Sequence, residues 1–167
     1  MKIVRRLLAV LAVHLLSGWP AAQALTCNNP DSAYTVNVDG TVLDTRNGLI
    51  WKQCAEGQSG PTCSGSATTH THTWSAALKL AASSTFAGAS DWRLPNIKEL
   101  SRLAEKCRSA PYINITIFPG TPSESFWSAS PYAPVPAGAW NVSFDNGNSS
   151  AGDQSGGNHV RLVRSGQ

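Results

Sequence analysis

The densest group of polar side chains lies in the last quarter of the chain, where amide, hydroxyl and carboxylate groups could hydrogen-bond the hydroxyls of a ligand. From Asp145 to His159 no residue is more apolar than alanine, so this segment cannot build a core. We predict a polar loop that binds a ligand, held between two strands; a flexible solvent-exposed loop is the alternative. The candidate contacts are Asn141, Ser143, Asp145, Asn146, Asn148, Asp153 and Asn158.

Three larger side chains extend this candidate site. Trp127 or Trp140 could provide a flat surface on which a sugar ring stacks, although Trp140 alternates with Val142 and Phe144, which favours burial. Arg161 could contact an anionic sugar, as could Arg164, but a structural ion pair is the commoner role of such residues. We therefore include Trp127, Trp140 and Arg161 among the candidate site residues.

The same segment offers little to a metal ion or to catalysis. Calcium could in principle be held by Asp145, Asn146 and Asp153, but no EF-hand spacing is present, so we predict no metal and no cofactor. His159 could be combined with an aspartate and one of many serines, yet no nucleophile elbow accompanies them. We predict no catalytic residues and expect that the protein is not an enzyme.

The N-terminal residues have the features of a secretory signal peptide. Three cations, Lys2, Arg5 and Arg6, precede an apolar run at 7–16, and Ala22-Gln23-Ala24 forms a cleavage site. We predict a signal peptide at 1–24, an exported mature domain at 25–167 in the periplasm, secreted or on the cell surface, and no transmembrane span.

Charge excludes one class of partner. Without the three signal-peptide cations, the 13 Lys and Arg become 10, which equals the 10 Asp and Glu, so the mature chain has zero net charge. A general affinity for nucleic acid or for an acidic membrane surface is therefore not expected, although a local basic patch is compatible with this balance.

The four cysteines all lie in the predicted exported part, where an even count indicates two disulfides. Three pairings are available. We favour Cys54 with Cys63, because the glycines and proline between them suit a tight loop, and this leaves Cys27 to pair with Cys107. The alternative of a lipid on Cys27 requires a lipobox, and the preceding residues match one poorly.

Local patterns predict an α+β domain with two helices packed on antiparallel strands. Alternation and turn residues indicate hairpins around Asp39-Gly40 and Asn47-Gly48. Thr73 and Asn96 are expected to cap the two helices, the second of which has an apolar face that runs to Cys107. Further strands are expected at 126–130, 139–144 and 159–164.

Several of these segments together resemble the bacterial DUF1566 family, which includes the C-terminal domain of the Legionella collagen-like protein. The segments that carry the resemblance are 39–42, 47–52, Thr73-Trp74, Ala77-Leu78, 91–100, Phe118-Pro119, Phe126-Trp127-Ser128, Ala139-Trp140 with Val142 and Phe144, and 160–164. The resemblance implies a fold similar to C-type lectins and formylglycine-generating enzymes. It also implies surface attachment, binding of sulfated polysaccharide and a homotrimer, although this chain has no collagen repeats.

These observations lead to one functional hypothesis and one alternative. We expect a secreted or surface-exposed, adhesin-like binding domain that recognises a glycan or another extracellular ligand. The alternative is a non-catalytic structural or assembly module that binds a cell-envelope protein or itself, and an uncharacterised hydrolase ranks below both. Formylglycine-generating chemistry is not expected, because no cysteine follows Cys107.

Overall fold

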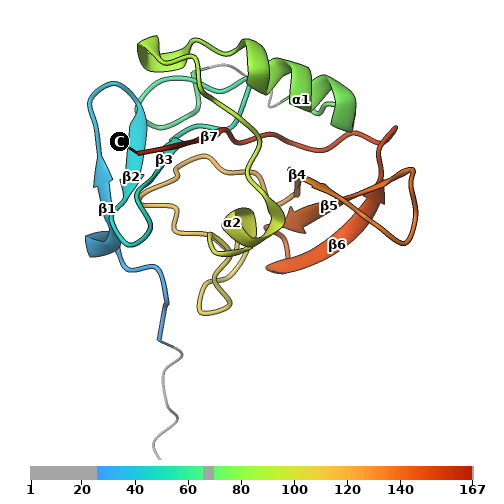
Figure 1. Cartoon of the computed structure of the whole chain (residues 1–167). Coiled ribbons are helices and arrows are strands. Elements are labelled where there is room, and N and C mark those ends of the chain that lie inside the picture. Colours follow the sequence, from blue (N-terminus) through green and yellow to red (C-terminus); the bar gives the residue numbers. More distant parts are fainter. Residues whose placement is uncertain (1–25, 66–69, 167) are drawn as a thin grey trace, which may run out of the picture.

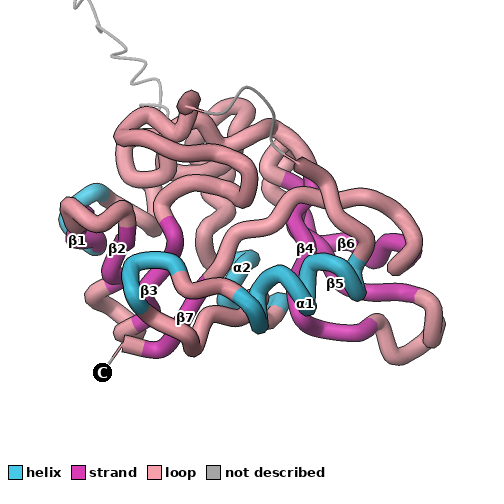
Figure 2. The backbone as a smooth tube through the Cα atoms, turned by 90° about the horizontal axis from the view of Figure 1, so that it is seen from above, coloured by secondary structure: helices cyan, strands magenta, loops and turns pink. Residues whose placement is uncertain are grey.

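The computed structural model describes residues 26–65 and 70–166, so the predicted signal peptide at 1–24 lies outside the described residues. Strands gather into two antiparallel sheets, and two helices pack against them (Figures 1 and 2). This arrangement confirms the predicted α+β class. Within the described residues, no helix is both long enough and apolar enough to span a membrane.

The first sheet combines the N-terminal hairpins with the last strand of the chain. Its strand order is β1-β2-β3-β7, and every neighbouring pair is antiparallel. The predicted turns are confirmed, since Gly40 and Gly48 have φ angles of +80° and +69°, which glycine adopts readily. The strands are β1 (Tyr34–Val36), β2 (Thr41–Asp44), β3 (Leu49–Lys52) and β7 (Val163–Ser165).

The second sheet comes from the polar, C-terminal part of the chain. It contains β4 (Ser125–Pro131), β5 (Gly138–Ser143) and β6 (Asn148–Asp153), in that order. The prediction of a continuous loop over 145–158 is wrong, because β6 pairs with β5 along its whole length. The polar composition of 148–153 reflects an exposed edge strand, whose side chains contribute little to a core.

Two short helices complete the fold. Helix α1 (Trp74–Ser83) begins at Thr73, whose side chain accepts a hydrogen bond from the backbone N–H of Ala76 at 3.4 Å, as predicted. Helix α2 (Ile97–Ser101) begins with a complete capping box between Asn96 and Glu99. A single-turn 3₁₀ helix, Phe86–Gly88, lies between them.

The predicted continuation of the second helix to Cys107 is wrong. The helix ends at Ser101, and the chain then turns to pair with a later loop. The backbone N–H of Glu105 donates to the carbonyl of Tyr112 at 2.8 Å, and Ala104 forms a bridge with Ile113. These contacts replace helical hydrogen bonds, so tertiary pairing overrides the local helical pattern.

Two hydrophobic clusters form the core. The larger one joins the first sheet to the second through side chains such as Trp51, Phe126 and Phe144. The smaller one packs α1 on Trp92, Leu94 and Trp127. Trp51 is buried in the larger cluster, with 1% of its surface exposed.

Both disulfides form as predicted, Cys27–Cys107 and Cys54–Cys63. The first links the N-terminal segment to the loop after α2. The second joins two cysteines that are nine positions apart in the sequence and so closes the loop after β3.

Candidate ligand-binding surface

The β5–β6 hairpin carries the part of the predicted site that faces solvent. Its turn is stabilised locally: the backbone N–H of Asp145 donates to the Ser143 hydroxyl at 3.2 Å, and that of Asn148 donates to the Asn146 side-chain oxygen at 3.0 Å. Asp145, Asn146 and Asn148 are exposed, and Ser143 is half-buried. The hairpin therefore holds several neutral polar groups and one carboxylate at a rigid turn.

The chain after α2 lies against this turn. The Lys106 ammonium donates to the Asn148 side-chain oxygen at 3.0 Å. A Cβ built on Gly147 would lie 3.4 Å from the Tyr112 ring and 3.6 Å from the Lys106 side chain, so the two segments are in close contact. Two elements that are far apart in sequence thus form one surface.

Three exposed cations lie along α2 and the chain after it, at intervals of four residues: Lys98, Arg102 and Lys106. On a helix, positions four apart lie on the same face, which applies to Lys98 and to Arg102 at the helix end. Within the described residues, none of the three forms an ion pair with a carboxylate. We call these three residues, together with the β5–β6 turn, the cationic surface.

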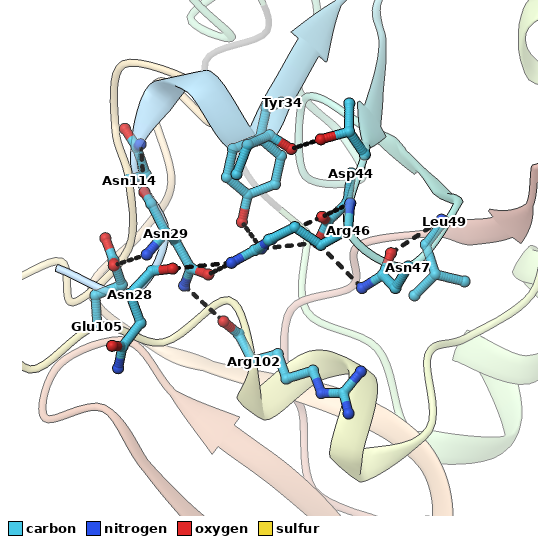
Figure 3. A network of polar contacts seen from close by, with 12 residues as sticks. Asn28, Asn29, Tyr34, Asp44, Arg46, Asn47, Leu49, Arg102, Glu105 and Asn114 are labelled. Atoms are coloured by element: carbon cyan, nitrogen blue, oxygen red, sulfur yellow. Dashed lines mark hydrogen bonds and ion pairs between the residues drawn. The ribbon is translucent and has the colours of Figure 1, made fainter.

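A hollow of about 380 Å³ adjoins this surface at the end of α2. The residues that line it are mostly polar and include Asn28, Asn47, Ser101, Arg46 and Arg102. Figure 3 shows that Arg46 is engaged with its neighbours, whereas the Arg102 guanidinium points away from that network. Arg102 is therefore the cation of this hollow that has donors available for a ligand.

Three of the predicted contacts are buried, which corrects the sequence-based site. Trp127 is 1% exposed, and its indole N–H donates to the carbonyl of His72 at 2.7 Å. Asn141 is 4% exposed and accepts a hydrogen bond from the Ser150 hydroxyl at 2.9 Å. Both side chains are buried, on β4 and β5 respectively, so we remove them from the candidate site.

Arg161 is the third buried residue and the clearest correction. It has no exposed surface, and it donates to the carbonyls of Lys52 and Gln53 and to the Thr121 hydroxyl. Its guanidinium also lies over the Phe118 ring, 4.9 Å from the centroid. Burial lowers the pKa of Arg161 to about 9, so the side chain is still charged at pH 7. Arg161 stabilises the fold and cannot reach an external ligand.

The remaining predicted residues lie at the other end of β6. Six residues of strand span about 17 Å, so Asp153 is far from the Asn146–Asn148 turn. Asp153 is exposed, and hydrogen bonds from the Ser155 side chain and backbone lower the pKa of its carboxyl. Asn158 is half-buried, and its backbone pairs with that of His72.

Trp140 is also at this end of the hairpin. It is half-buried, and its ring meets that of Tyr132 edge to face at 5.0 Å. Tyr132, Val135 and Asp153 line a small hollow of about 280 Å³ nearby. Trp140 is thus supported by Tyr132 and belongs to a second, smaller polar and aromatic area.

The geometry does not bring the conceivable calcium ligands together. Asp145 and Asn146 are at one end of the hairpin and Asp153 is at the other. Among residues 26–65 and 70–166, the side chains of metal-ligand type that lie close enough together to share one ion are those of Cys27, Glu105 and Cys107. Both cysteines are in the disulfide.

Sequence reasoning missed the cations of α2. The signal was present as lysine and arginine at intervals of four opposite an apolar helix face, but the candidate cations named from the sequence were Arg161 and Arg164. Arg93, just before α2, has a structural role, since it pairs with Glu99 at 2.7 Å and bridges to Val163 through its backbone. Lys98 and Arg102 form no such ion pair among the described residues.

The fold and the surface define a class of protein: a small, disulfide-linked α+β domain whose solvent-facing polar and cationic side chains gather around one hairpin. The model of the family described as the Lcl C-terminal domain matches residues 40–164, so the chain belongs to this family. A comparison with curated proteins gave no match. The family and the two disulfides indicate an exported protein.

Proposed function

We propose that this domain is a non-catalytic binding module that recognises an anionic polysaccharide outside the cytoplasm. One observation carries the proposal: Lys98, Arg102 and Lys106 are exposed and form no ion pair with a carboxylate among the described residues, next to a turn of polar side chains that are neutral except for Asp145. The other cations considered for this role are engaged elsewhere, since Arg161 is buried and Arg164 pairs with Asp91 at 2.7 Å.

The chemistry of the surface suits a sulfated or carboxylated sugar chain. Cations spaced along one face can meet repeated negative charges, while Asn146 and Asn148 can hydrogen-bond hydroxyl groups. Each exposed contact is weak and screened by salt, so affinity depends on several contacts at once. Asp145, on the same turn, repels an anionic group of the ligand that comes close to it. The anionic groups of the ligand are therefore expected to lie beside the cations and away from Asp145.

Binding to immobilised heparin, a sulfated polysaccharide, tests the proposal, with dextran as the neutral probe. The double variant Lys98→Gln/Arg102→Gln is expected to lose about tenfold or more in heparin affinity, since removing two charge-assisted contacts costs about 1 to 3 kcal/mol. The matched control is Lys79→Gln, which removes an exposed cation from α1 and is expected to bind as the unmodified protein does.

Thermal unfolding of each variant checks that the fold is intact. The heparin-binding measurement is made both with and without calcium. Equal heparin binding by the double variant and the Lys79 control would contradict the cationic surface as the site. Dextran binding as tight as heparin binding would contradict an anionic ligand and favour recognition of neutral sugars at the Tyr132–Trp140 area.

A further inference from the structure

Tyr112 lies between the two parts of the cationic surface, the chain after α2 and the β5–β6 turn. Its backbone N–H donates to the carbonyl of Phe144 at 2.7 Å, and its own carbonyl accepts from the N–H of Glu105 at 2.8 Å. Tyr112 is thus bonded on one side to the hairpin and on the other to the segment that carries Lys106.

Buried neighbours anchor the backbone at this position. Phe144 and Ile113, the residue after Tyr112, have no exposed surface, and Glu105 is 3% exposed. The fold therefore positions the side chain of Tyr112 before a ligand arrives, which lowers the entropic cost of binding.

The side chain of Tyr112 is half-buried, and its polar and aromatic groups are not used within the described residues. Its ring pairs with no other aromatic ring of that part of the chain. Its hydroxyl has no hydrogen-bond partner there and is not buried, so it faces solvent. Tyr132, which is also half-buried, differs because its ring packs on that of Trp140.

The Tyr112 ring and the Lys106 side chain both border Gly147. A Cβ built on Gly147 would lie 3.4 Å from the ring and 3.6 Å from the Lys106 side chain. The Lys106 ammonium in turn donates to the Asn148 side-chain oxygen at 3.0 Å. An aromatic ring, a cation and an amide therefore lie side by side on this surface.

We propose that Tyr112 makes this surface specific for sugar rings, by stacking its own ring against one face of a pyranose. The inference rests on the proposed function and names the residue that selects sugars among polyanions. The face of a pyranose presents C–H groups that pack on an aromatic ring, while its hydroxyls at the ring edge can bond to Asn148 and to the Tyr112 hydroxyl. The cations alone attract any polyanion, because Coulomb attraction does not distinguish sulfate from phosphate.

A single-stranded nucleic acid also combines negative charge with rings that stack. It fits this surface less well. Asp145 on the same turn repels phosphates, and residues 25–167 have 10 Lys and Arg against 10 Asp and Glu, so they carry no excess positive charge.

NMR on the unmodified protein tests the contact directly. The chain has three tyrosines, Tyr34, Tyr112 and Tyr132, so labelling of tyrosine rings gives few signals to assign. When a heparin oligosaccharide binds, nuclear Overhauser effects are expected between the Tyr112 ring and sugar C–H protons, and none at Tyr34 or Tyr132. Binding without any such effect at Tyr112 would overturn the proposal.

Substitution at Tyr112 measures its share of the affinity. Tyr112→Leu is expected to lower heparin affinity about fivefold, and Tyr112→Phe, which keeps the ring, is expected to retain most of it. The matched control is Tyr132→Leu, the same change at a half-buried tyrosine at the other end of the hairpin, which is expected to leave heparin affinity unchanged. Inorganic polyphosphate, a polyanion without sugar rings, is expected to bind Tyr112→Leu and the unmodified protein equally.

Salt separates stacking from charge. The loss caused by Tyr112→Leu should stay the same as salt rises, whereas the loss caused by Lys98→Gln/Arg102→Gln should shrink, because salt screens exposed charges. An equal loss of polyphosphate binding by Tyr112→Leu, or tighter binding of an oligothymidylate than of heparin, would overturn the proposal. These outcomes leave the cationic site standing, which fails only if the double variant binds heparin as the unmodified protein does.

Discussion

Two arginines, the buried Arg161 and the partly exposed Arg46, are bonded into the fold of this protein, whereas the cations of α2 face solvent with donors to spare. Arg161 and Arg46 donate to carbonyls, hydroxyls and a carboxylate from several segments. Lys98 and Arg102 make no side-chain hydrogen bond within the described residues. The same chemical groups thus serve the fold in one region and are available to a ligand in the other.

Exposure and unused donors, and not residue type, separate cations that are available to a ligand from structural ones. A guanidinium has five N–H donors, and once carbonyls and carboxylates of the chain occupy them it has little left for a ligand. Substitutions in the two groups should therefore affect different measurements: stability for Arg161 and Arg46, and binding for the cations of α2.

The largest effect is expected from Arg161→Met, which keeps the length of the side chain and removes its donors. The carbonyls of Lys52 and Gln53 and the Thr121 hydroxyl would lose a buried partner. We expect the free energy of unfolding to fall by about 3 kcal/mol, measured by urea denaturation. A change below about 0.5 kcal/mol would contradict a structural role for Arg161.

Arg46→Met is expected to have a smaller effect of the same kind. Arg46 pairs with the buried Asp44 at 2.9 Å and also donates to Asn28, Asn29 and Tyr34 (Figure 3). Its side chain is 38% exposed, so solvent already weakens these contacts, and we expect a loss of about 1 to 2 kcal/mol in urea denaturation. Arg46→Lys should recover part of this loss, because it restores the charge without the planar group.

Much of the fold could be predicted from the sequence, because its signals are local. Asp39-Gly40 and Asn47-Gly48 define hairpin turns, Thr73 and Asn96 cap helices, and the spacing of Cys54 and Cys63 suits a closed loop. The end of α2 at Ser101 could not be predicted this way, since it depends on pairing of Glu105 with Tyr112. The lectin-like comparison remains a prediction.

The candidate site was harder to predict for the same reason. Polar composition identified the exposed hairpin turn at 145–148, but Asn141 and Arg161 have the same polar character and are buried by contacts distant in sequence. Lys98 and Arg102 were visible in the sequence, yet the lack of a carboxylate partner is a property of the folded chain. A sequence pattern cannot show which donors the fold has used.

His159 provides a third case, a buried group that becomes a cation only on protonation. It is 6% exposed, its Nδ1 has no hydrogen-bond partner in the described part of the chain, and burial lowers its pKa below the ordinary 6.5; Glu124 opposes this shift and His72 adds to it. Since the unfolded chain binds the proton more readily, the free energy of unfolding should decrease as the pH falls through 6.5, and this decrease ends at the lower folded pKa.

The melting temperature between pH 7.5 and 5 measures this dependence. His159→Gln should flatten the curve in that range, whereas His70→Gln, at an exposed position, should leave it unchanged. A curve for His159→Gln that matches that of the unmodified protein would show that other groups cause the dependence.

The smallest effect on stability, and the sharpest contrast between the two regions, is expected from a pair of single substitutions with the same change in charge. Arg102→Gln and Arg164→Gln each remove one positive charge, but Arg164 is engaged with Asp91 at 2.7 Å and lies over the Trp92 ring at 6.0 Å. Both should change the free energy of unfolding by no more than about 0.5 kcal/mol, because these positions are at the surface. Only Arg102→Gln should weaken heparin binding, by about threefold at low salt, and the difference should shrink as salt screens the contact. Equal weakening by both substitutions would mean that heparin responds to the overall charge of the protein, and the distinction between engaged and available cations would then have no bearing on binding.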